Sequence, residues 1–403
     1  MKVKNIIIAQ DRYSILGGIS TVNKLLGRAF EEAGYNVSYM ALFDNTAGHP
    51  DAIEPDFVVN SGPWVNKTTH NRLVYTNPGP LGAALAAKKC FTVLWDCYNT
   101  FRTRRYLRSF GKDTVVLTSM AKTADYMAKY AQPDHKKGIG YIHEFHSGYN
   151  STYRLDGEKT LRKVAASYDS FVTLSEGDAK LFAQWLNRPV EAVHNPIEPL
   201  SEETSEMVRQ GEKKPVIQYI GRYGPEKGLG RILESFIACA EDFPEWTLRY
   251  NGSGSEEEIL ALKEKLAQAD PEIARRVEIG GTLNAQEVLE TFAQSSLAVM
   301  ASEFEGLPMS FLEAMQVGTP LISYPSSWAL REMVPEVGYL AEEPSIEALT
   351  EQMRLAMSDA QLRAKKSALC LEKSRTFSPE YVVRHWEKLF ESIHRLAAAV
   401  TDS

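Results

Sequence analysis

Short apolar runs alternate with longer segments whose apolar residues recur at helical spacing along most of the chain. Short runs bounded by turn residues are typical of buried parallel strands, and the longer segments predict helices that cover them. The chain opens with a predicted strand at 3–9, a helix from about Ser20 to Gly34 and a strand at 36–42, which together form a right-handed βαβ unit. The pattern therefore predicts an α/β fold with parallel sheets.

Two domains are expected, because 403 residues exceed what one hydrophobic core usually organises. The predicted division is a first domain at 1–197, a polar linker at 198–214, a second domain at 215–378 and a terminal amphipathic helix at 379–403. Further strands of the first domain are predicted at 56–60, 72–75, 91–95, 114–118, 138–142, 169–174 and 190–193. Strands of the second domain are predicted at 216–220, 246–250, 277–279, 297–301 and 320–324.

Composition and charge exclude several classes of protein. The net charge is −7, which argues against a general nucleic-acid-binding protein. No apolar stretch reaches the length of a transmembrane helix, and Gln10 and Asp11 interrupt the first apolar run too early for a secretory signal. A cytoplasmic protein is expected. The four cysteines show no Cys-x-x-Cys spacing, so thiols packed as small hydrophobic groups are expected rather than disulfides or zinc ligands.

The strongest candidate site follows the predicted strand at 297–301. A loop there carries Glu305, and a predicted helix from Met309 to Val317 carries Glu313, with seven residues between the two glutamates. In an open α/β sheet, ligands bind at the edge where such loops follow the strands. The free amides at the helix start, with the helix dipole, favour a phosphate group. The segment that carries these amides comprises Gly306, Leu307, Pro308, Met309 and Ser310, of which Pro308 itself has no amide hydrogen.

This segment resembles the E-x7-E motif of the retaining glycosyltransferases of family 4, which have the GT-B fold. The resemblance covers nearly the whole chain. It implies two Rossmann-like domains that face each other across a cleft, with the terminal helix crossing back to the first domain. In that family the first glutamate, here Glu305, holds sugar hydroxyls and the second, here Glu313, holds the ribose. The alternative is a capping Glu305 and a solvated Glu313.

Three other segments of the second domain fit the same resemblance. Gly221 and Arg222, followed by Lys227, resemble the element whose two cations grip the donor diphosphate. Gly252 lies in a turn like the family's Gly-x-Gly turn, and Gly280, Gly281 and Thr282 resemble the segment whose backbone binds the nucleobase. We therefore expect Glu305, Arg222 and Lys227 to act in catalysis, together with a histidine from the first domain.

In the first domain, Gly17 and Gly18 precede the first helix, where the resemblance places a glycine loop at the cleft; an ordinary turn is the alternative. His143 and His146 follow a predicted strand beside Glu144. Such a trio could suggest a metal, but no further ligand cluster joins it. The resemblance instead implies a histidine that reaches the donor sugar, and His146 matches it best, with His143 second. Two loop histidines with local hydrogen bonds remain an alternative.

The expected function is the transfer of a hexose, with retention, from a nucleotide-diphosphate sugar. A UDP-sugar is the expected donor, and the expected acceptor is a cell-surface glycan, a teichoic acid or a lipid-linked molecule. Neither a cofactor nor a metal is expected, since protein cations can stabilise the leaving diphosphate. The alternatives are a nucleotide-sugar epimerase of the same fold and a degenerate, non-catalytic binding subunit.

The segment 101–112 carries five basic residues and no acidic one. A solvated helix face is one interpretation. The other is that this segment meets an anionic surface, either phospholipid headgroups or a phosphate-bearing cell-wall polymer. In the second case, exchanging Arg102, Arg104, Arg105 and Arg108 for Gln would weaken that binding at low salt. The protein would then be peripheral on the inner face of the cell membrane.

Overall fold

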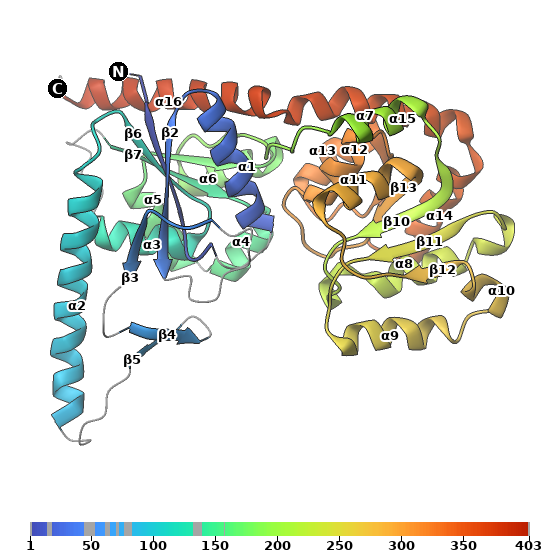
Figure 1. Cartoon of the computed structure of the whole chain (residues 1–403), viewed down its shortest axis with the longest axis horizontal. Helices are drawn as coiled ribbons and strands as arrows, with labels where there is room; N and C mark the ends of the chain where they lie inside the picture. Colours follow the sequence, from blue (N-terminus) through green and yellow to red (C-terminus); the bar gives the residue numbers. More distant parts are fainter. Residues whose placement is uncertain are drawn as a thin grey trace. The chain divides into compact units, whose positions relative to one another are not determined.

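The computed structural model describes residues 2–13, 18–43, 53–60, 65–69, 72–75, 83–131, 139–156 and 158–401. The chain divides into two compact units. The first comprises residues 1–173, 179–193 and 383–403, and the second comprises residues 174–178 and 194–382. Each unit contains its own parallel sheet, which confirms the predicted α/β class (Figure 1).

The first unit has a parallel sheet of seven described strands in the order β3-β2-β1-β6-β7-β8-β9. A separate antiparallel hairpin consists of β4 and β5. The strands are β1 Asn5–Gln10, β2 Asn36–Phe43, β3 Phe57–Asn60, β4 Val65–Thr69, β5 Arg72–Tyr75, β6 Thr114–Thr118, β7 Gly140–Phe145, β8 Ser170–Thr173 and β9 Glu191–Ala192. The helices are α1 Gly18–Glu32, α2 Ala83–Leu107, α3 Ala121–Tyr130, α4 Tyr149–Asp156, α5 Glu158–Ser167, α6 Glu176–Leu186 and α16 Pro379–Thr401, which starts in the second unit.

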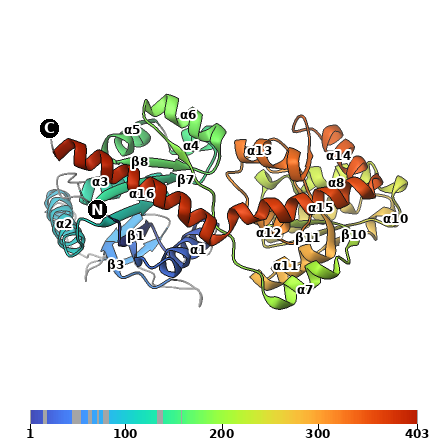
Figure 2. The ribbon, with the colours of Figure 1, turned by 90° about the horizontal axis from the view of Figure 1, so that it is seen from above.

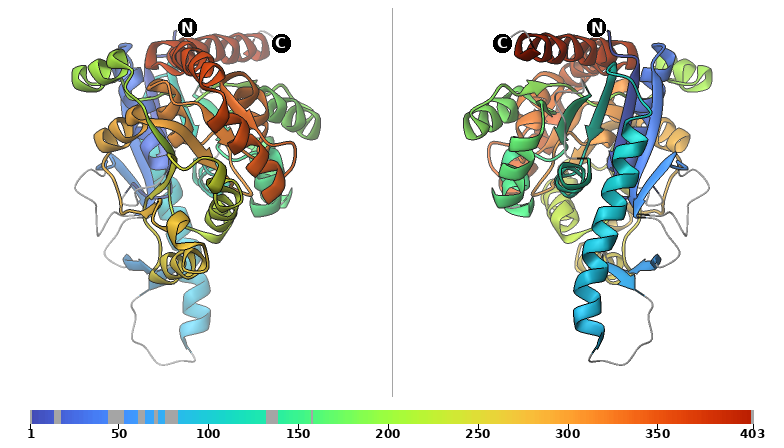
Figure 3. Two further views of the ribbon diagram at one scale, coloured as in Figure 1. Left: turned by 90° about the vertical axis from the view of Figure 1, so that its right-hand side faces the viewer. Right: turned by 90° about the vertical axis from the view of Figure 1, so that its left-hand side faces the viewer.

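Helices flank the first sheet (Figures 2 and 3). One hydrophobic cluster joins strand residues such as Val116 and Phe171 to side chains of α3, α5 and α6. Elsewhere in the unit, α16 contributes Trp386 and Phe390, which pack against Phe30 at the end of α1. The Tyr35 hydroxyl donates a hydrogen bond to the carboxylate of Glu387 on α16, at 3.0 Å. The stretch 386–390 of α16 is therefore part of this unit's packing.

The second unit has a sheet of six described parallel strands in the order β12-β11-β10-β13-β14-β15. The strands are β10 Lys214–Ile220, β11 Thr247–Asn251, β12 Val277–Ile279, β13 Ser295–Met300, β14 Leu321–Ser323 and β15 Gly338–Leu340. The helices are α7 Glu202–Gln210, α8 Leu229–Ile237, α9 Glu256–Leu266, α10 Pro271–Ala274, α11 Ala285–Gln294, α12 Met309–Gln316, α13 Trp328–Val337, α14 Ile346–Ser358 and α15 Ala360–Ser374. Short 3-10 turns are η2 Pro225–Lys227, η3 Ala240–Asp242 and η4 Arg375–Phe377.

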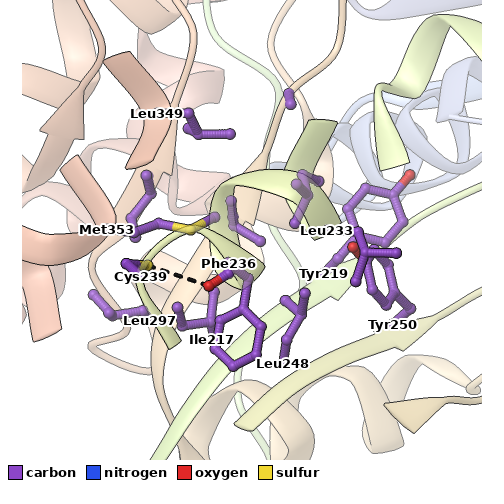
Figure 4. Packing of buried hydrophobic residues seen from close by; sticks show 14 of the residues in the cluster. Ile217, Tyr219, Leu233, Phe236, Cys239, Leu248, Tyr250, Leu297, Leu349 and Met353 are labelled. Carbon is purple, nitrogen blue, oxygen red and sulfur yellow. Dashed lines mark hydrogen bonds between the residues drawn. The ribbon is translucent and has the colours of Figure 1, made fainter. Parts of the chain in front are cut away.

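One face of the second sheet carries the larger hydrophobic cluster of this unit (Figure 4). Ile217, Leu248 and Leu297 of the central strands meet Phe236 of α8 and Met353 of α14, and all are almost fully buried. The order of the strands reverses between β10 and β13, since β11 and β12 lie on one side of β10 and the later strands lie on the other. In such sheets the loops diverge at this point, which leaves room for a ligand.

Several sequence predictions differ from the structure. The strand predicted at 91–95 is wrong, because these residues lie inside helix α2; the apolar run Phe91–Trp95 was too short to distinguish strand from helix. The strand predicted at 72–75 forms, but in the hairpin instead of the parallel sheet. Cys97 is exposed, contrary to the expectation for the cysteines, whereas Cys239 and Cys370 are buried.

The segment predicted as an irregular linker, 198–214, contains helix α7. The Ser201 hydroxyl accepts a hydrogen bond from the Thr204 amide at the helix start, and Gly211 ends the helix with a φ of 68°. The Gln286 amide of α11 donates to the Thr204 hydroxyl at 2.8 Å. These contacts fix the helix on the second unit. Few of its side chains are buried, so the sequence shows no apolar periodicity that would have predicted a helix here.

Lys213 connects the ends of two helices in the second unit. Its ammonium group lies 3.1 Å from the Ala293 carbonyl oxygen near the end of α11, 3.3 Å from the Val317 carbonyl oxygen after α12 and 2.8 Å from the Thr319 hydroxyl. Helix ends present unpaired carbonyl groups and a partial negative charge, both of which a cation satisfies. Burial lowers the pKa of Lys213 to about 8, so the ammonium form still predominates at neutral pH.

We expect Lys213→Met to lower the free energy of unfolding by roughly 2–4 kcal/mol, because several buried carbonyl groups would lose their donor. Chemical denaturation at pH 7 measures this loss. Lys214→Met is the matched control, since the neighbouring Lys214 is exposed. Equal stability losses in the two variants would contradict the role given to Lys213.

Candidate functional site

The loops that follow β10, β11 and β12 pack closely through backbone groups. The Gly221 amide donates to the Asn251 carbonyl at 3.0 Å, and the Gly252 amide donates to the Gly281 carbonyl at 2.9 Å. A Cβ atom at Gly252 would lie only 1.8 Å from the Gly221 carbonyl oxygen, so this position admits only glycine without rearrangement. The carboxyl edge of the sheet is thus lined by main chain, and a ligand can approach it closely.

Lys227 and Glu305 form an ion pair at the same edge, with 2.7 Å between Nζ and Oε1. Their side chains retain 21% and 11% of their exposure, so the pair is largely withdrawn from water but accessible. Lys227 ends the turn η2 after β10, and Glu305 lies in the loop between β13 and α12. Strands β10 and β13 are neighbours, which explains why residues 78 apart in sequence meet.

Gly228 permits this meeting. It has a φ of 68°, and a Cβ atom there would lie 2.2 Å from the carbonyl oxygen of Ala301, directly after β13. A larger residue would therefore push the turn that carries Lys227 away from the loop that carries Glu305. The Glu303 amide also donates to the Glu226 carbonyl at 2.8 Å, which connects the same two loops.

Arg222 does not join the Lys227–Glu305 pair. Its guanidinium contacts the carboxylate of Glu226, and its side chain is 60% exposed. The structure therefore brings two of the predicted catalytic residues of this unit together and leaves the third beside them, in solvent. The Glu226 contact holds Arg222 only weakly, since exposed ion pairs contribute little.

The start of α12 is exposed to this edge in part. Pro308 is the N-cap residue, and Met309 is the first helical residue. The Pro308 carbonyl accepts a hydrogen bond from the Phe311 amide at 3.0 Å. The amides of Met309 and Ser310 have no acceptor inside the helix, as at every helix start. The Ser327 hydroxyl donates to the Gly306 carbonyl at 2.8 Å and fixes the preceding loop, in which Leu307 is buried. The helix start is thus preorganised for an anion.

Glu313 lies in the second turn of α12 and forms no ion pair with any described residue. Desolvation raises the pKa of its carboxyl group to about 7, although the side chain keeps some exposure. A half-buried carboxylate without a cation is costly, so its presence on this helix favours a role in binding.

The segment predicted to bind a nucleobase lies beyond β12. The Tyr223 hydroxyl donates to the Gly280 carbonyl at 2.8 Å, which anchors the segment to the loop after β10. Gly281 and Thr282 are exposed, and no atom approaches the position of a Cβ at Gly281. Backbone groups in this segment are therefore open to a planar ligand.

In the first unit, His146 lies just after β7 and its Nε2 is 3.1 Å from the carboxylate of Glu144. Both side chains are nearly buried, at 7% and 5% exposure. His143 differs: it is 1% exposed, its Nδ1 lies 2.9 Å from the Thr118 hydroxyl, and burial lowers its pKa to about 3. His143 is thus a neutral core residue, which leaves His146 as the better-placed histidine. Gly18 begins α1, and Gly17 lies outside the described residues.

The sequence pattern did not predict a polar network that lies at the carboxyl edge of the first sheet. The Asn23 side chain donates to the Gln10 side chain at 2.7 Å and accepts from the Ser119 hydroxyl at 2.9 Å. Nearby in sequence, Arg12 stacks on the ring of Phe43, while its Nε and Nη2 are buried without a hydrogen-bond acceptor in the part of the chain that the structure describes. The available signal was the run of polar residues directly after the apolar strands.

Comparisons with known proteins show what the chain is similar to. Residues 201–368 match the family model "Glycosyl transferases group 1". The chain is 25% identical over 385 residues to an uncharacterized glycosyltransferase of Haemophilus influenzae, covering 93% of this chain and 94% of that protein.

A poly(glycerol-phosphate) alpha-glucosyltransferase of Bacillus subtilis is 25% identical over 169 residues, which are 41% of this chain and 24% of that one. Among solved structures, the pneumococcal O-GlcNAc transferase GtfA, in complex with UDP and GlcNAc, is similar with a TM-score of 0.68 at 12% identity. That similarity covers 98% of this chain and 99% of GtfA. The fold is therefore the GT-B fold, as predicted.

Glu313→Gln should stabilise the protein more at pH 8 than at pH 5. The carboxyl titrates near 7 in the folded chain and near 4.5 in the unfolded one, so the folded state binds more protons between these values and loses stability as the pH rises. The neutral amide avoids this penalty, which is on the order of 3 kcal/mol above pH 7. Thermal unfolding at both pH values, with the exposed Glu351→Gln as control, measures the difference. A gain that is the same at pH 5 and pH 8 would contradict the pKa assignment.

Proposed function

Because residues 201–368 form a domain of the glycosyl transferases group 1 family, we propose that this domain binds a nucleotide-diphosphate sugar and that the chain transfers the hexose to an acceptor held by the first unit. The observation that carries the proposal is the Lys227–Glu305 pair beside the start of α12. It combines a cation for a diphosphate, a carboxylate for sugar hydroxyls and free helix amides within one accessible edge.

In this proposal the donor diphosphate replaces Glu305 as the partner of Lys227. A phosphate oxygen offers Lys227 a charge-assisted hydrogen bond equal to the one it loses. The amides of Met309 and Ser310 and the positive end of the α12 dipole stabilise the same group. Arg222, whose side chain is exposed and pairs only with Glu226 among the described residues, adds a second cation when the leaving diphosphate gains charge.

Glu305, once released, accepts hydrogen bonds from sugar hydroxyls beside the anomeric carbon. Binding of the donor thus replaces the Lys227–Glu305 ion pair with two contacts to the ligand. Before the donor binds, the ion pair ensures that neither side chain is a partly buried charge without a partner. Glu313, deeper on the same helix, accepts hydrogen bonds from the ribose hydroxyls. Ligand binding then gives its carboxylate the partners that it lacks among the described residues.

The transfer proceeds with retention at the anomeric carbon. The bond between that carbon and the diphosphate oxygen breaks, and the acceptor oxygen forms its bond on the same face. The acceptor proton passes to a phosphate oxygen of the leaving group, so no covalent protein nucleophile is needed. Lys227 and the helix amides lower the barrier because they already lie at the edge where the oxygen becomes charged, and Arg222 adds its charge from the solvent side.

On the acceptor side, we assign His146 to the reacting sugar and Glu144 to its orientation. Arg12 favours an acceptor that carries a phosphate or another anion, because its buried Nε and Nη2 groups have no hydrogen-bond acceptor among the described residues. A phosphate-bearing polymer or a lipid-linked sugar has this chemistry. The similarity to a poly(glycerol-phosphate) glucosyltransferase supports the same class, and the basic segment at 101–112 lies in the same unit.

The alternatives receive less support. None of the comparisons above points to an epimerase. A non-catalytic binding subunit would not need the contact between Lys227 and Glu305, nor the glycine at 228 that permits this contact. We therefore retain the transferase.

Uridine diphosphate should bind this chain more tightly than guanosine or adenosine diphosphate. The exposed backbone at Gly280 to Thr282 offers a small edge that suits a pyrimidine, and the pneumococcal relative in fold was solved with UDP. Calorimetry with the three nucleotides at equal concentration measures the preference. Tighter binding of either purine nucleotide would refute the uridine assignment.

Lys227→Ala and Glu305→Gln should each lower turnover at saturating donor by at least about tenfold, since one lost charge-assisted contact costs roughly 1.5–3 kcal/mol. The measurement is sugar release or transfer from a UDP-sugar panel. Lys214→Ala is the matched control, because Lys214 is exposed at the amino end of β10, the end opposite to the turn that carries Lys227. Full activity in either site variant would remove the role proposed for that residue.

A further inference from the structure

Helix α2 presents an apolar stripe to solvent. Leu94, Tyr98 and Phe101 are 68%, 48% and 62% exposed, and their spacing places them on one face of the helix. Trp95, Asn99 and Thr103 lie on the opposite face and are buried. The stripe is thus a second apolar face, separate from the one that attaches the helix to its unit.

Basic residues continue the same stripe toward the end of the helix. Arg105 and Arg108 are exposed and Arg104 is half-buried. Together with Cys97, Thr100 and Phe101 they line a surface hollow of about 780 Å³. Asp96 is the one acidic residue between 94 and 112; it pairs with Lys129 at 2.7 Å and accepts from the Tyr130 hydroxyl. The basic half therefore has little internal neutralisation.

Arg102 does not belong to this surface. Its guanidinium stacks on the rings of Phe57 and Tyr98 and donates to the Val59 carbonyl at 3.2 Å. It therefore attaches α2 to strand β3. The four arginines that the sequence grouped together have two roles, and only three of them are available to a partner.

We propose that the exposed stripe of α2, formed by Leu94, Cys97, Tyr98, Phe101, Arg104, Arg105 and Arg108, docks on an anionic phospholipid surface. The apolar side chains enter the boundary between headgroups and acyl chains, and the guanidinium groups contact lipid phosphates. This binding deepens the proposed function by naming the surface on which the acceptor is met. The described helices include none that is long and apolar enough to span a bilayer, so the stripe would hold the chain at the surface.

The apolar residues favour a lipid over a soluble anionic polymer. A polymer of phosphates would be attracted by the three arginines but would leave Leu94 and Phe101 in water. A lipid surface satisfies both halves of the stripe, because burial of large apolar side chains and phosphate contacts both contribute at an interface.

Flotation of the full chain with vesicles tests the proposal. The vesicles contain either phosphatidylcholine alone or an equal mixture with phosphatidylglycerol, at low salt. The chain should float only with the anionic mixture. The triple change Arg104→Gln, Arg105→Gln and Arg108→Gln should weaken binding by roughly a hundredfold, and Leu94→Ser with Phe101→Ser should weaken it by at least about tenfold.

Two matched controls remove the same charge or the same apolar surface elsewhere. Lys159→Gln, Lys180→Gln and Lys263→Gln change three exposed basic residues, and Leu260→Ser with Leu355→Ser changes two exposed leucines. Both controls should float like the wild type. Thermal unfolding confirms that each variant is folded.

A label supplies a second measurement. Cys97 lies on the stripe and is exposed, so a polarity-sensitive dye attached there, in a Cys90→Ser background, should brighten when anionic vesicles are added. Binding to phosphatidylglycerol vesicles that both stripe variants abolish, with the dye response, supports the proposal.

Absence of vesicle binding, or binding that survives either stripe variant, overturns it. So does a chain that binds soluble poly(glycerol phosphate) through the arginines while the leucine and phenylalanine changes have no effect. Calorimetry with uridine diphosphate is performed on the same variants. Unchanged nucleotide binding beside lost vesicle binding separates a failure of this inference from a failure of the proposed transferase.

Discussion

The close approach of backbone segments at one edge of the second sheet is the constraint on which the site depends. Parallel strands bring all their carboxyl ends to the same edge, and β10 and β13 are neighbours there. Gly228 allows the turn after β10 to touch the carbonyl of Ala301, and Gly252 allows the next loop to touch that of Gly221. The contact at Gly228 brings the turn that carries Lys227 to the loop that carries Glu305, so a glycine beside Lys227 permits a pair of charges to form.

Helix α12 is held at its end and open at its start. Lys213 satisfies the carbonyl groups where α11 and α12 finish, so the end of α12 is fixed by a buried cation. The start, by contrast, has Pro308 as cap, without a side-chain acceptor for the first amides. The helix can therefore bind an anion at its start, while its end is held in place by the contacts of Lys213. A ligand phosphate at the start would accept hydrogen bonds from the first amides, which have no acceptor within the helix.

Much of this could be predicted from the sequence, because the signals are local. The strand, loop and helix around Glu305 and Glu313 follow from a short apolar run, a proline and helical periodicity, and the structure has them within one or two residues. The pairing of Lys227 with Glu305 was not predictable in this way. It depends on the order of strands in the sheet, which brings together residues 78 apart. His143 and His146 illustrate the same limit: three residues apart, one is in the core and the other lies at the strand end.

Helix α2 shows why exposure is harder to predict than periodicity. Apolar residues occur on both of its faces, so no single apolar stripe marks its orientation, and the run at 91–95 resembles a buried strand. Only the contacts of Trp95, Asn99 and Arg102 reveal which face is internal. Once that face is known, Leu94 and Phe101 become surplus apolar surface that the fold does not use. Docking at an interface explains both features, because it would use the exposed apolar side chains and the three arginines beside them.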